Sequence, residues 1–294
     1  MKQLLFEIID VFTDGASLGN PAGLVRLSGS EPIPEEMMQQ LGRELRGCVN
    51  ETAFVYEKND EFYLRFFSSE CEVAFCGHAL IGTFYRLITT EPHLRDKKNL
   101  TIHVQAGSLL VSNRVAEEDA VFIMAPQPQF LERSIEAEEI KDALGLSVYE
   151  PTDLLPEVID GGLRTLICPM PTRASVLGMT PDEGMLLRFC LEKDIDIVHV
   201  FTDETSSADA NYRARVFAPR FGYLEDPATG SGNAAFAWYL QKRGLLPDKM
   251  NIEQGPSGNA PNHVKIKRII SDGQNQILFG GRADTRMTGT YYLR

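Results

Sequence analysis

A polar, glycine-containing loop followed by an apolar helical pattern occurs twice in this sequence, and this repeat constrains the fold more than any other feature. Aligning the two loops, residues 72–79 and 225–232, at an offset of 153 residues places Gly77 on Gly230. Apolar residues at helical spacing follow each loop. A repeat of about half of the 294-residue chain predicts two duplicated halves rather than a solenoid of short units.

The segments before the two loops also correspond. A proline and two glutamates open an amphipathic helix predicted at residues 34–45, because these residue types suit the positive end of a helix. A strand is predicted next, at residues 52–56. The counterparts of this helix and strand lie at residues 181–191 and 195–201. We therefore expect the same order of elements in both halves.

The boundary between the halves is predicted near residue 127. The first half would span residues 1–126 and the second half residues 127–279, with a proline-flanked linker at residues 127–131. The end of the chain is predicted to form two strands around Gly289. Residues 280–294 could complete the first half or return to the second.

Charge and composition exclude several classes of partner. The 41 acidic and 29 basic residues give a net charge of −12, which repels nucleic acid and anionic membranes. No apolar run approaches the roughly 20 residues that cross a bilayer, and Glu7 and Asp10 interrupt any signal-peptide core. The five cysteines are irregularly spaced, which does not suit a disulfide framework. We expect a cytoplasmic protein.

The two helix starts are candidate anion sites. The first turn of a helix has unpaired N–H groups that bind carboxylates, and Gly77 and Gly230 would let a ligand approach the backbone. A single glycine of this kind is explained better by a tight turn than by a ligand. The pairing of the two starts, with His78, Asp226 and Ser231 as polar neighbours, favours a binding site.

Cys76 is a candidate base or nucleophile. A helix start lowers the pKa of a thiol and makes the thiolate available, although a free cysteine is often a small buried filler. Its counterpart, Thr229, has a hydroxyl that cannot act as a base near neutral pH. A symmetric mechanism with two thiols is therefore excluded.

The same region could be considered for a metal or a nucleotide cofactor. Cys71, Cys76 and His78 lack the second compact ligand pair of a zinc site, so no metal is expected. Residues 228–232 lack the Lys-Ser/Thr ending of a phosphate-binding loop. We expect no cofactor.

Glu51 is a candidate proton carrier at the start of the predicted strand 52–56, after Asn50. A partly buried carboxylate has a raised pKa and can take and return a proton near neutrality. The alternative is an ordinary solvated glutamate at a strand edge. Position alone does not decide between them.

At these residues the sequence resembles the phenazine-biosynthesis PhzF-like family of isomerases, a branch of the diaminopimelate epimerase and proline racemase fold. The strings F-C-G-H-A and E-D-P-A-T-G-S carry most of the resemblance, and the matching segments occur in family order over nearly the full length. These segments are residues 19–23, 50–55, 72–79, 162–166 and 225–231.

The resemblance implies an α+β fold with two pseudo-symmetric halves. Each half would be a curled, mostly antiparallel, hotdog-like barrel around a central helix, with the ligand in a cleft between the halves. It also implies a homodimer. The best-understood member of the family moves a proton within a dihydro-hydroxyanthranilate by means of a glutamate.

Carried over by motif, that glutamate is Glu51, with His78 and Asp226 as further catalytic residues. Three departures leave the substrate open: Asn50 replaces the usual serine, Leu80 replaces a threonine, and residues 256–262 lack the common G-R-P-S. The expected substrate-binding residues are Asn20, Cys76, Gly77, Thr229, Gly230 and Ser231.

These observations predict a cofactor-independent isomerase that acts on a small carboxylate-bearing substrate, open-chain or cyclic. Glu51 would carry the proton. One alternative is a racemase, epimerase or dehydratase that uses Cys76 as a base. The other is a non-catalytic protein that binds a small acid.

Overall fold

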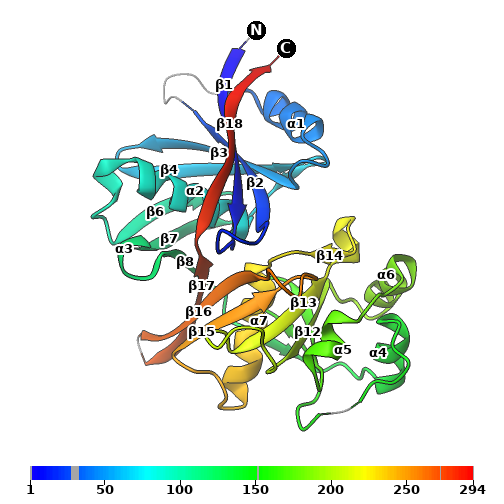
Figure 1. The fold of residues 1–294 in the computed structure, drawn as a ribbon. Coiled ribbons are helices and arrows are strands. Elements are labelled where there is room, and N and C mark those ends of the chain that lie inside the picture. The colour runs from blue at the N-terminus through cyan, green and yellow to red at the C-terminus, as the bar shows by residue number, and fades with distance from the viewer. Residues whose placement is uncertain (1, 28–32, 151, 272, 294) are drawn as a thin grey trace. The chain divides into compact units, whose positions relative to one another are not determined.

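The computed structural model describes residues 2–27, 33–150, 152–271 and 273–293, and the chain divides into two compact units. Unit 1 comprises Met1–Met124 and Gly280–Arg294, and unit 2 comprises Ala125–Phe279. In unit 1 the last strand, β18, runs antiparallel beside the first, β1, as Figure 1 shows in red and blue.

Unit 1 contains two principal helices, α1 and α2, and the strands against which they pack. Its elements are β1 (Lys2–Val11), β2 (Asn20–Arg26), α1 (Glu35–Glu44), β3 (Glu51–Lys58), β4 (Glu61–Ser68), β5 (Glu72–Val73), α2 (Gly77–Thr90), the 3-10 helix η1 (Pro92–Leu94), β6 (Asn99–Val104), β7 (Gly107–Arg114), α3 (Val115–Glu118), β8 (Ala120–Met124) and β18 (Ala283–Leu293).

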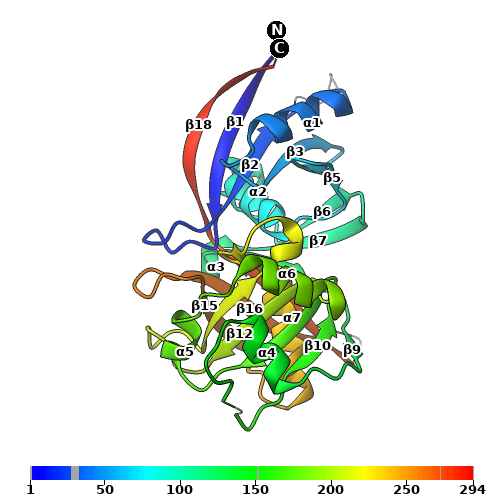
Figure 2. The same ribbon diagram turned by 90° about the vertical axis from the view of Figure 1, so that its right-hand side faces the viewer.

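Unit 2 repeats much of this order. Its elements are β9 (Gln129–Leu131), α4 (Ala137–Ala143), β10 (Glu157–Asp160), β11 (Arg164–Pro169), α5 (Arg173–Leu177), α6 (Glu183–Glu192), β12 (Ile197–Thr202), β13 (Tyr212–Phe217), η2 (Pro219–Phe221), β14 (Glu225–Asp226), α7 (Gly230–Lys242), β15 (Lys249–Gln254), β16 (Asn262–Ser271) and β17 (Gln274–Gly281), whose last two residues belong to unit 1. Helices α4 and α6 contact each other on one side of this unit (Figure 2).

The expected repeat of element order is present. In unit 1, β2 is followed by α1, β3, β4, β5, α2 and β6, and in unit 2, β11 is followed by α5, α6, β12, β13, β14, α7 and β15. Each series contains two parallel strand pairs, β2–β3 and β4–β6 in the first, and β11–β12 and β13–β15 in the second. In each of these pairs a helix connects the two strands.

The strand pairing corrects one part of the predicted fold. We expected curled, mostly antiparallel barrels. Most of the described strand pairs are antiparallel, as expected, but each unit also contains two parallel pairs, so the strands form a mixed sheet rather than a curled barrel. The reason is the helical crossovers, because a helix between two neighbouring strands returns the second strand in the direction of the first. Loops and apolar patterns in the sequence do not distinguish such a crossover from a hairpin.

The same type of ion pair occurs in each unit. It joins two strands that precede the helix start. Arg65 donates to both carboxylate oxygens of Glu72, each at 2.7 Å, and Arg215 does the same to Glu225 at 3.0 and 2.8 Å. Each arginine also lies over the phenylalanine two positions later, at 5.1 and 4.9 Å from the ring centre. These matching side-chain contacts support the duplication of the two units.

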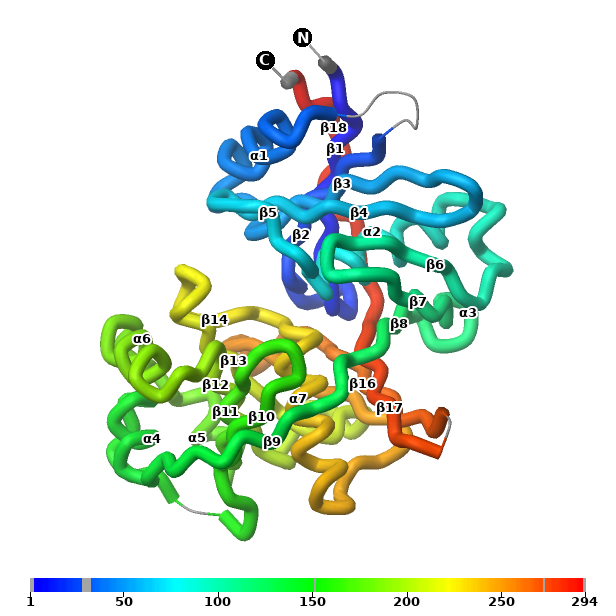
Figure 3. The backbone as a smooth tube through the Cα atoms, turned by 180° about the vertical axis from the view of Figure 1, so that it is seen from behind, coloured from blue at the N-terminus to red at the C-terminus, as the bar shows by residue number. Residues whose placement is uncertain are grey.

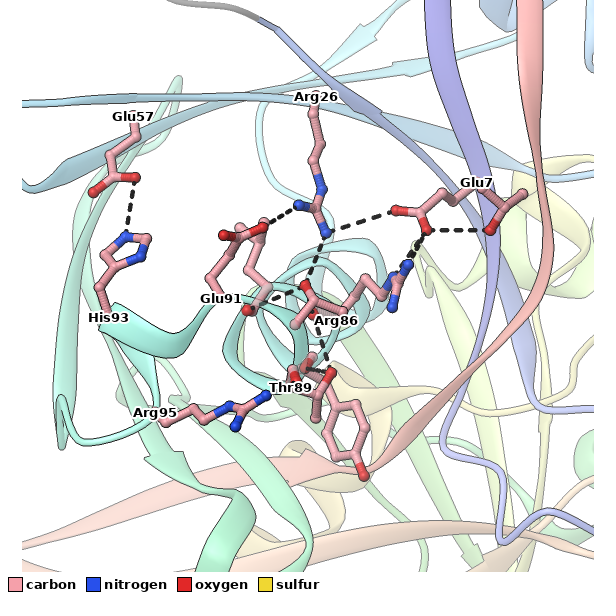
Figure 4. Close-up of polar contacts among 12 residues, drawn as sticks. Glu7, Arg26, Glu57, Arg86, Thr89, Glu91, His93 and Arg95 are labelled. Carbon is pink, nitrogen blue, oxygen red and sulfur yellow. Dashed lines mark hydrogen bonds and ion pairs between the residues drawn. The ribbon is translucent and has the colours of Figure 1, made fainter.

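Helix α2 is held against β1, β2, β3, β8 and β18 by its apolar residues. Gly82 faces β1, where a Cβ atom would lie 2.6 Å from the Val11 side chain, so glycine permits the close approach. A buried charge adds to this packing. Glu7 on β1 is 1% exposed, and its carboxylate pairs with Arg86 of α2 at 2.6 Å and with Arg26 of β2 at 3.8 Å (Figure 4).

Helix α7 is buried on nearly all sides, as expected for the central helix of a unit. It packs against β10, β11, β12 and β16. The Trp238 indole N–H donates to the carbonyl of Pro126 at 3.1 Å, and the Tyr239 hydroxyl donates to the carbonyl of Leu155 at 2.8 Å. The polar groups of these two aromatic residues are therefore hydrogen-bonded.

Two local predictions were wrong. The expected linker contains β9, which pairs antiparallel with β10, as the tube in Figure 3 shows. Gly289 does not separate two strands, because it lies within β18 opposite Phe6. In the part of the chain that the structure describes, no helix is long and apolar enough to span a membrane. All five cysteines lie within that part, and none of them forms a disulfide.

Candidate functional site

Three chemically active side chains meet in unit 1. The nearest carboxylate oxygen of Glu51 lies 3.4 Å from Nε2 of His78, and Nδ1 of His78 lies 3.5 Å from Sγ of Cys76. One ligand-type atom from each residue lies within 4.8 Å of the other two. Glu51 and His78, two of the three residues predicted to be catalytic, are thus in direct contact.

Two neighbouring elements position these side chains. Glu51 is the first residue of β3, where it pairs with Ser68 of β4. The chain returns through β5 and begins α2 at Gly77, so Cys76 is the residue before the helix and His78 is its second residue. Asn20 opens β2, which runs parallel to β3, and its side chain is buried at the same end of the strand pair.

The start of α2 resembles the anion site predicted from the sequence. The Cys76 side chain makes no capping hydrogen bond, and the first turn contains no acidic residue. The first N–H groups of a helix carry a partial positive charge. A carboxylate could therefore bind here beside Glu51 and His78.

Burial determines the charge state of His78. Its side chain is 14% exposed, and removal from water lowers its pKa to about 4. The imidazole is therefore neutral at pH 7, with one nitrogen that donates and one that accepts. Glu51 is 19% exposed and lies beside this neutral ring rather than beside an imidazolium. A carboxylate next to a neutral imidazole can accept a proton and return it.

The corresponding helix start in unit 2 is a closed hydrogen-bond network. The Thr229 hydroxyl donates to Oδ2 of Asp226 at 2.6 Å and accepts from Nε2 of Gln254 at 3.1 Å. The Thr229 N–H donates to Oε1 of Gln254 at 3.0 Å. Asn233 donates to Oε1 of Gln254 at 2.6 Å and to the Thr229 carbonyl at 2.8 Å. Thr229 and Asp226 are thus brought together as predicted, but with two amides around them.

The network continues into the core of unit 2 through His199. Its Nε2 lies 3.0 Å from Oδ1 of Asn233, and its ring stacks on Phe236 with centres 4.9 Å apart. Burial lowers the pKa of His199 to about 4, so this ring is also neutral near pH 7. Our sequence analysis did not identify His199, Asn233 or Gln254. Of these three residues, only Asn233 could have been predicted to lie near Thr229, because it follows Thr229 by one helical turn.

Glycine at position 230 has a structural explanation. A Cβ atom there would lie 2.3 Å from the Phe279 ring, so the aromatic packing requires glycine whether or not a ligand binds. Ser231, the second residue of α7, is partly exposed. The glycine at position 230 therefore does not by itself indicate that a ligand approaches the backbone there.

A cavity of about 460 Å³ also opens in unit 2. Its wall contains Arg173, Ser206, Glu253 and His263 and none of the predicted site residues. The Glu253 carboxylate in this wall accepts from the Ser206 N–H at 3.0 Å and from the Ser207 N–H at 2.9 Å. The candidate site is therefore the group of Glu51, Cys76 and His78 in unit 1 rather than this cavity.

The comparisons with known proteins agree over almost the whole chain. The sequence model of the PhzC-PhzF family, described as phenazine biosynthesis-like protein, matches residues 9–289. The uncharacterized isomerase YfhB of Bacillus subtilis is 30% identical over 99% of this chain and 96% of its own length.

Solved structures show the same similarity at the level of the fold. The PhzF-family phenazine biosynthesis protein of Bacillus anthracis superposes with a TM-score of 0.86 and 26% identity, covering 99% of this chain and 100% of that chain. A probable proline racemase from Agrobacterium radiobacter gives a TM-score of 0.63 at 13% identity, covering 99% and 93% of the two chains. The second match shows a shared fold alone.

Proposed function

Since the chain belongs to the PhzC-PhzF family of phenazine biosynthesis-like proteins, we propose that it is a cofactor-independent isomerase that moves a proton within a small carboxylate-bearing metabolite, open-chain or cyclic. The observation that carries the proposal is the contact between the Glu51 carboxylate and the neutral imidazole of His78. Relatives of this chain are named isomerases, which supports the reaction class.

In this proposal Glu51 takes a proton from a carbon atom of the substrate. The electron pair of the broken C–H bond moves into an enolate-type system, and the Glu51 carboxylic acid then returns the proton to another carbon. Substrate and product have the same composition, so no other reactant is needed. The single N–H group of the neutral His78 ring can orient the Glu51 carboxylate, and the first N–H groups of α2 can stabilise the developing charge.

The substrate carboxylate would bind the first N–H groups of α2, with Asn20, Cys76 and Gly77 around it. This placement is supported by the uncapped helix start and by the burial of Asn20. From the sequence we further propose that Asp226, Thr229, Gly230 and Ser231 bind other polar groups of the substrate. In unit 2 the Asp226 carboxylate accepts a hydrogen bond from the Thr229 hydroxyl.

The test is the Glu51→Gln variant, assayed on the small acid that native mass spectrometry finds with the purified protein. Loss of a positioned proton carrier should reduce kcat by about 10²- to 10⁴-fold. Glu57→Gln is the matched control, because Glu57 is an exposed glutamate on the same strand. Full turnover by Glu51→Gln would exclude the proposed role.

A second candidate is a racemase or epimerase with Cys76 as a base. The 3.5 Å distance between its sulfur and His78 favours this alternative, because an imidazole can accept a thiol proton. The two mechanisms differ in the response to Cys76→Ala. A Glu51 shuttle predicts a loss of less than about tenfold, whereas a Cys76 base predicts a loss of the order of 10²-fold or more.

We also propose that the protein works in the cytoplasm as a homodimer. The exposed thiols of Cys48 and Cys71 support a reducing compartment. The dimer is an expectation from the family resemblance. Light scattering at a concentration near that in cells tests the dimer directly.

A further inference from the structure

The three side chains that meet in unit 1 are also the three most common types of zinc ligand. We propose that Glu51, Cys76 and His78 bind one zinc ion reversibly, with water in the fourth position, and that the bound ion inhibits the isomerase. The inhibition rests on the proposed function, but the binding does not. From the sequence we considered Cys71 in place of Glu51 and expected no metal; in the structure Cys71 is exposed and outside this group.

The distances suit a tetrahedral ion. Zinc bonds of about 2.0–2.3 Å to nitrogen, oxygen and sulfur place neighbouring ligand atoms roughly 3.3–3.7 Å apart. The sulfur of Cys76 lies 3.5 and 4.0 Å from the two nitrogens of His78, and a Glu51 oxygen lies 3.4 Å from the second nitrogen. Since all three ligand atoms lie within 4.8 Å of one another, shifts of about 1 Å would complete the geometry.

The types of ligand select the metal. Thiolate and imidazole favour zinc over magnesium or calcium, which prefer oxygen ligands in larger number. Three protein ligands with an open fourth position are typical of accessible rather than structural zinc sites. The Glu51 and His78 side chains are 19% and 14% exposed, so an ion can reach them from solvent.

The ion would stop the reaction for a simple reason. A carboxylate that coordinates zinc is much less basic, so Glu51 could no longer take a proton from a substrate carbon. The ion would also lie at the start of α2, where the substrate carboxylate is proposed to bind. Substrate and zinc should therefore compete.

Binding is tested first, without substrate, on protein stripped with a chelator. Titration with zinc in a calorimeter should show one ion per chain, and Cys76→Ala should weaken the affinity by at least about tenfold. Cys71→Ala is the matched control and should bind as the unaltered protein does. Cys76→Ser serves as a second variant in case the alanine variant is unstable.

Cobalt provides a spectroscopic test of the same ligands. Cobalt(II) bound at this site should show a thiolate charge-transfer absorption in the unaltered protein and in Cys71→Ala, and none in Cys76→Ala. Absence of stoichiometric binding, or equal binding by Cys71→Ala and Cys76→Ala, would overturn the proposal.

Inhibition is tested separately. One equivalent of zinc should abolish turnover, and a chelator should restore it. Unchanged turnover with zinc bound would contradict the inhibitory role. If Glu51→Gln retained full turnover in zinc-free buffer, the proposed isomerase mechanism would fail, while the binding measurements would still decide the zinc site.

Discussion

The starts of α2 and α7 have the same backbone form but opposite side-chain chemistry. Both helices follow an extended residue, Cys76 or Thr229, that makes no capping hydrogen bond of its own. In unit 2 the Thr229 side chain is saturated by Asp226 and Gln254. In unit 1 the Cys76 side chain makes longer contacts with a neutral histidine, next to Glu51.

This difference shows how two similar helix starts in a duplicated fold can have different roles. The helix start in unit 2 is stabilised by a network of short hydrogen bonds, which suits a fixed binding surface. The helix start in unit 1 keeps a carboxylate, an imidazole and a thiol within reach of one another, which suits proton transfer. The account therefore assigns the chemistry to unit 1, and its predictions compare matched positions in the two units.

The largest expected stability effect concerns the duplicated arginines. Arg215 is 7% exposed and also donates to the Met179 carbonyl at 2.7 Å, whereas Arg65 is 34% exposed. Arg215→Met leaves Glu225 as a poorly hydrated charge and should lower the free energy of unfolding by about 3–5 kcal/mol. Arg65→Met should cost about 1 kcal/mol or less. Urea titration of both variants checks this, and equal losses would contradict the inferred difference in burial.

The next effect concerns the closed network at α7. Thr229→Val keeps the shape of the side chain but removes the hydrogen bonds to Asp226 and Gln254, so it should cost about 1–3 kcal/mol. Thr229→Ser retains the hydroxyl and serves as the control. A valine variant as stable as the serine variant would show that the network contributes nothing to folding.

The smallest expected effect is on the pH dependence of the free energy of unfolding. Burial holds the pKa of His199 at about 4, below the ordinary value of 6.5, so between these values the unfolded state binds more protons and stability falls as pH falls. His199→Gln keeps a donor for Asn233 but does not titrate. The loss of unfolding free energy between pH 7 and pH 6 should be smaller in this variant by about 0.7 kcal/mol. An equal loss between pH 7 and pH 6 in the variant and in the unaltered protein would contradict a buried, neutral imidazole at position 199.

Much of the scaffold could be predicted because the signals are local. The paired loops before Gly77 and Gly230 predicted both helix starts, and the helix predicted at residues 34–45 is α1, which spans Glu35–Glu44. The expected linker was wrong because β9 is three residues long, and its pairing with β10 depends on a contact about 30 residues away. Short strands of this kind have no periodicity to detect.

The site was predictable where its residues lie close in the sequence. Cys76 and His78 are two residues apart, and Glu51 came from a motif. Gln254 joins Thr229 across 25 residues, and the Phe279 ring packs on Gly230 across a longer span, so both contacts exist only after folding. A buried amide also has no composition signal, because asparagine and glutamine are ordinary surface residues.

The central claim is that Glu51 in unit 1 moves the proton. The most direct measurement is proton NMR in heavy water, with the co-purified acid and a panel of small carboxylates incubated with the unaltered protein, Glu51→Gln and Glu57→Gln. The account predicts that the unaltered protein and Glu57→Gln introduce deuterium at a substrate carbon and Glu51→Gln does not. Deuterium incorporation by Glu51→Gln at the unaltered rate would contradict it.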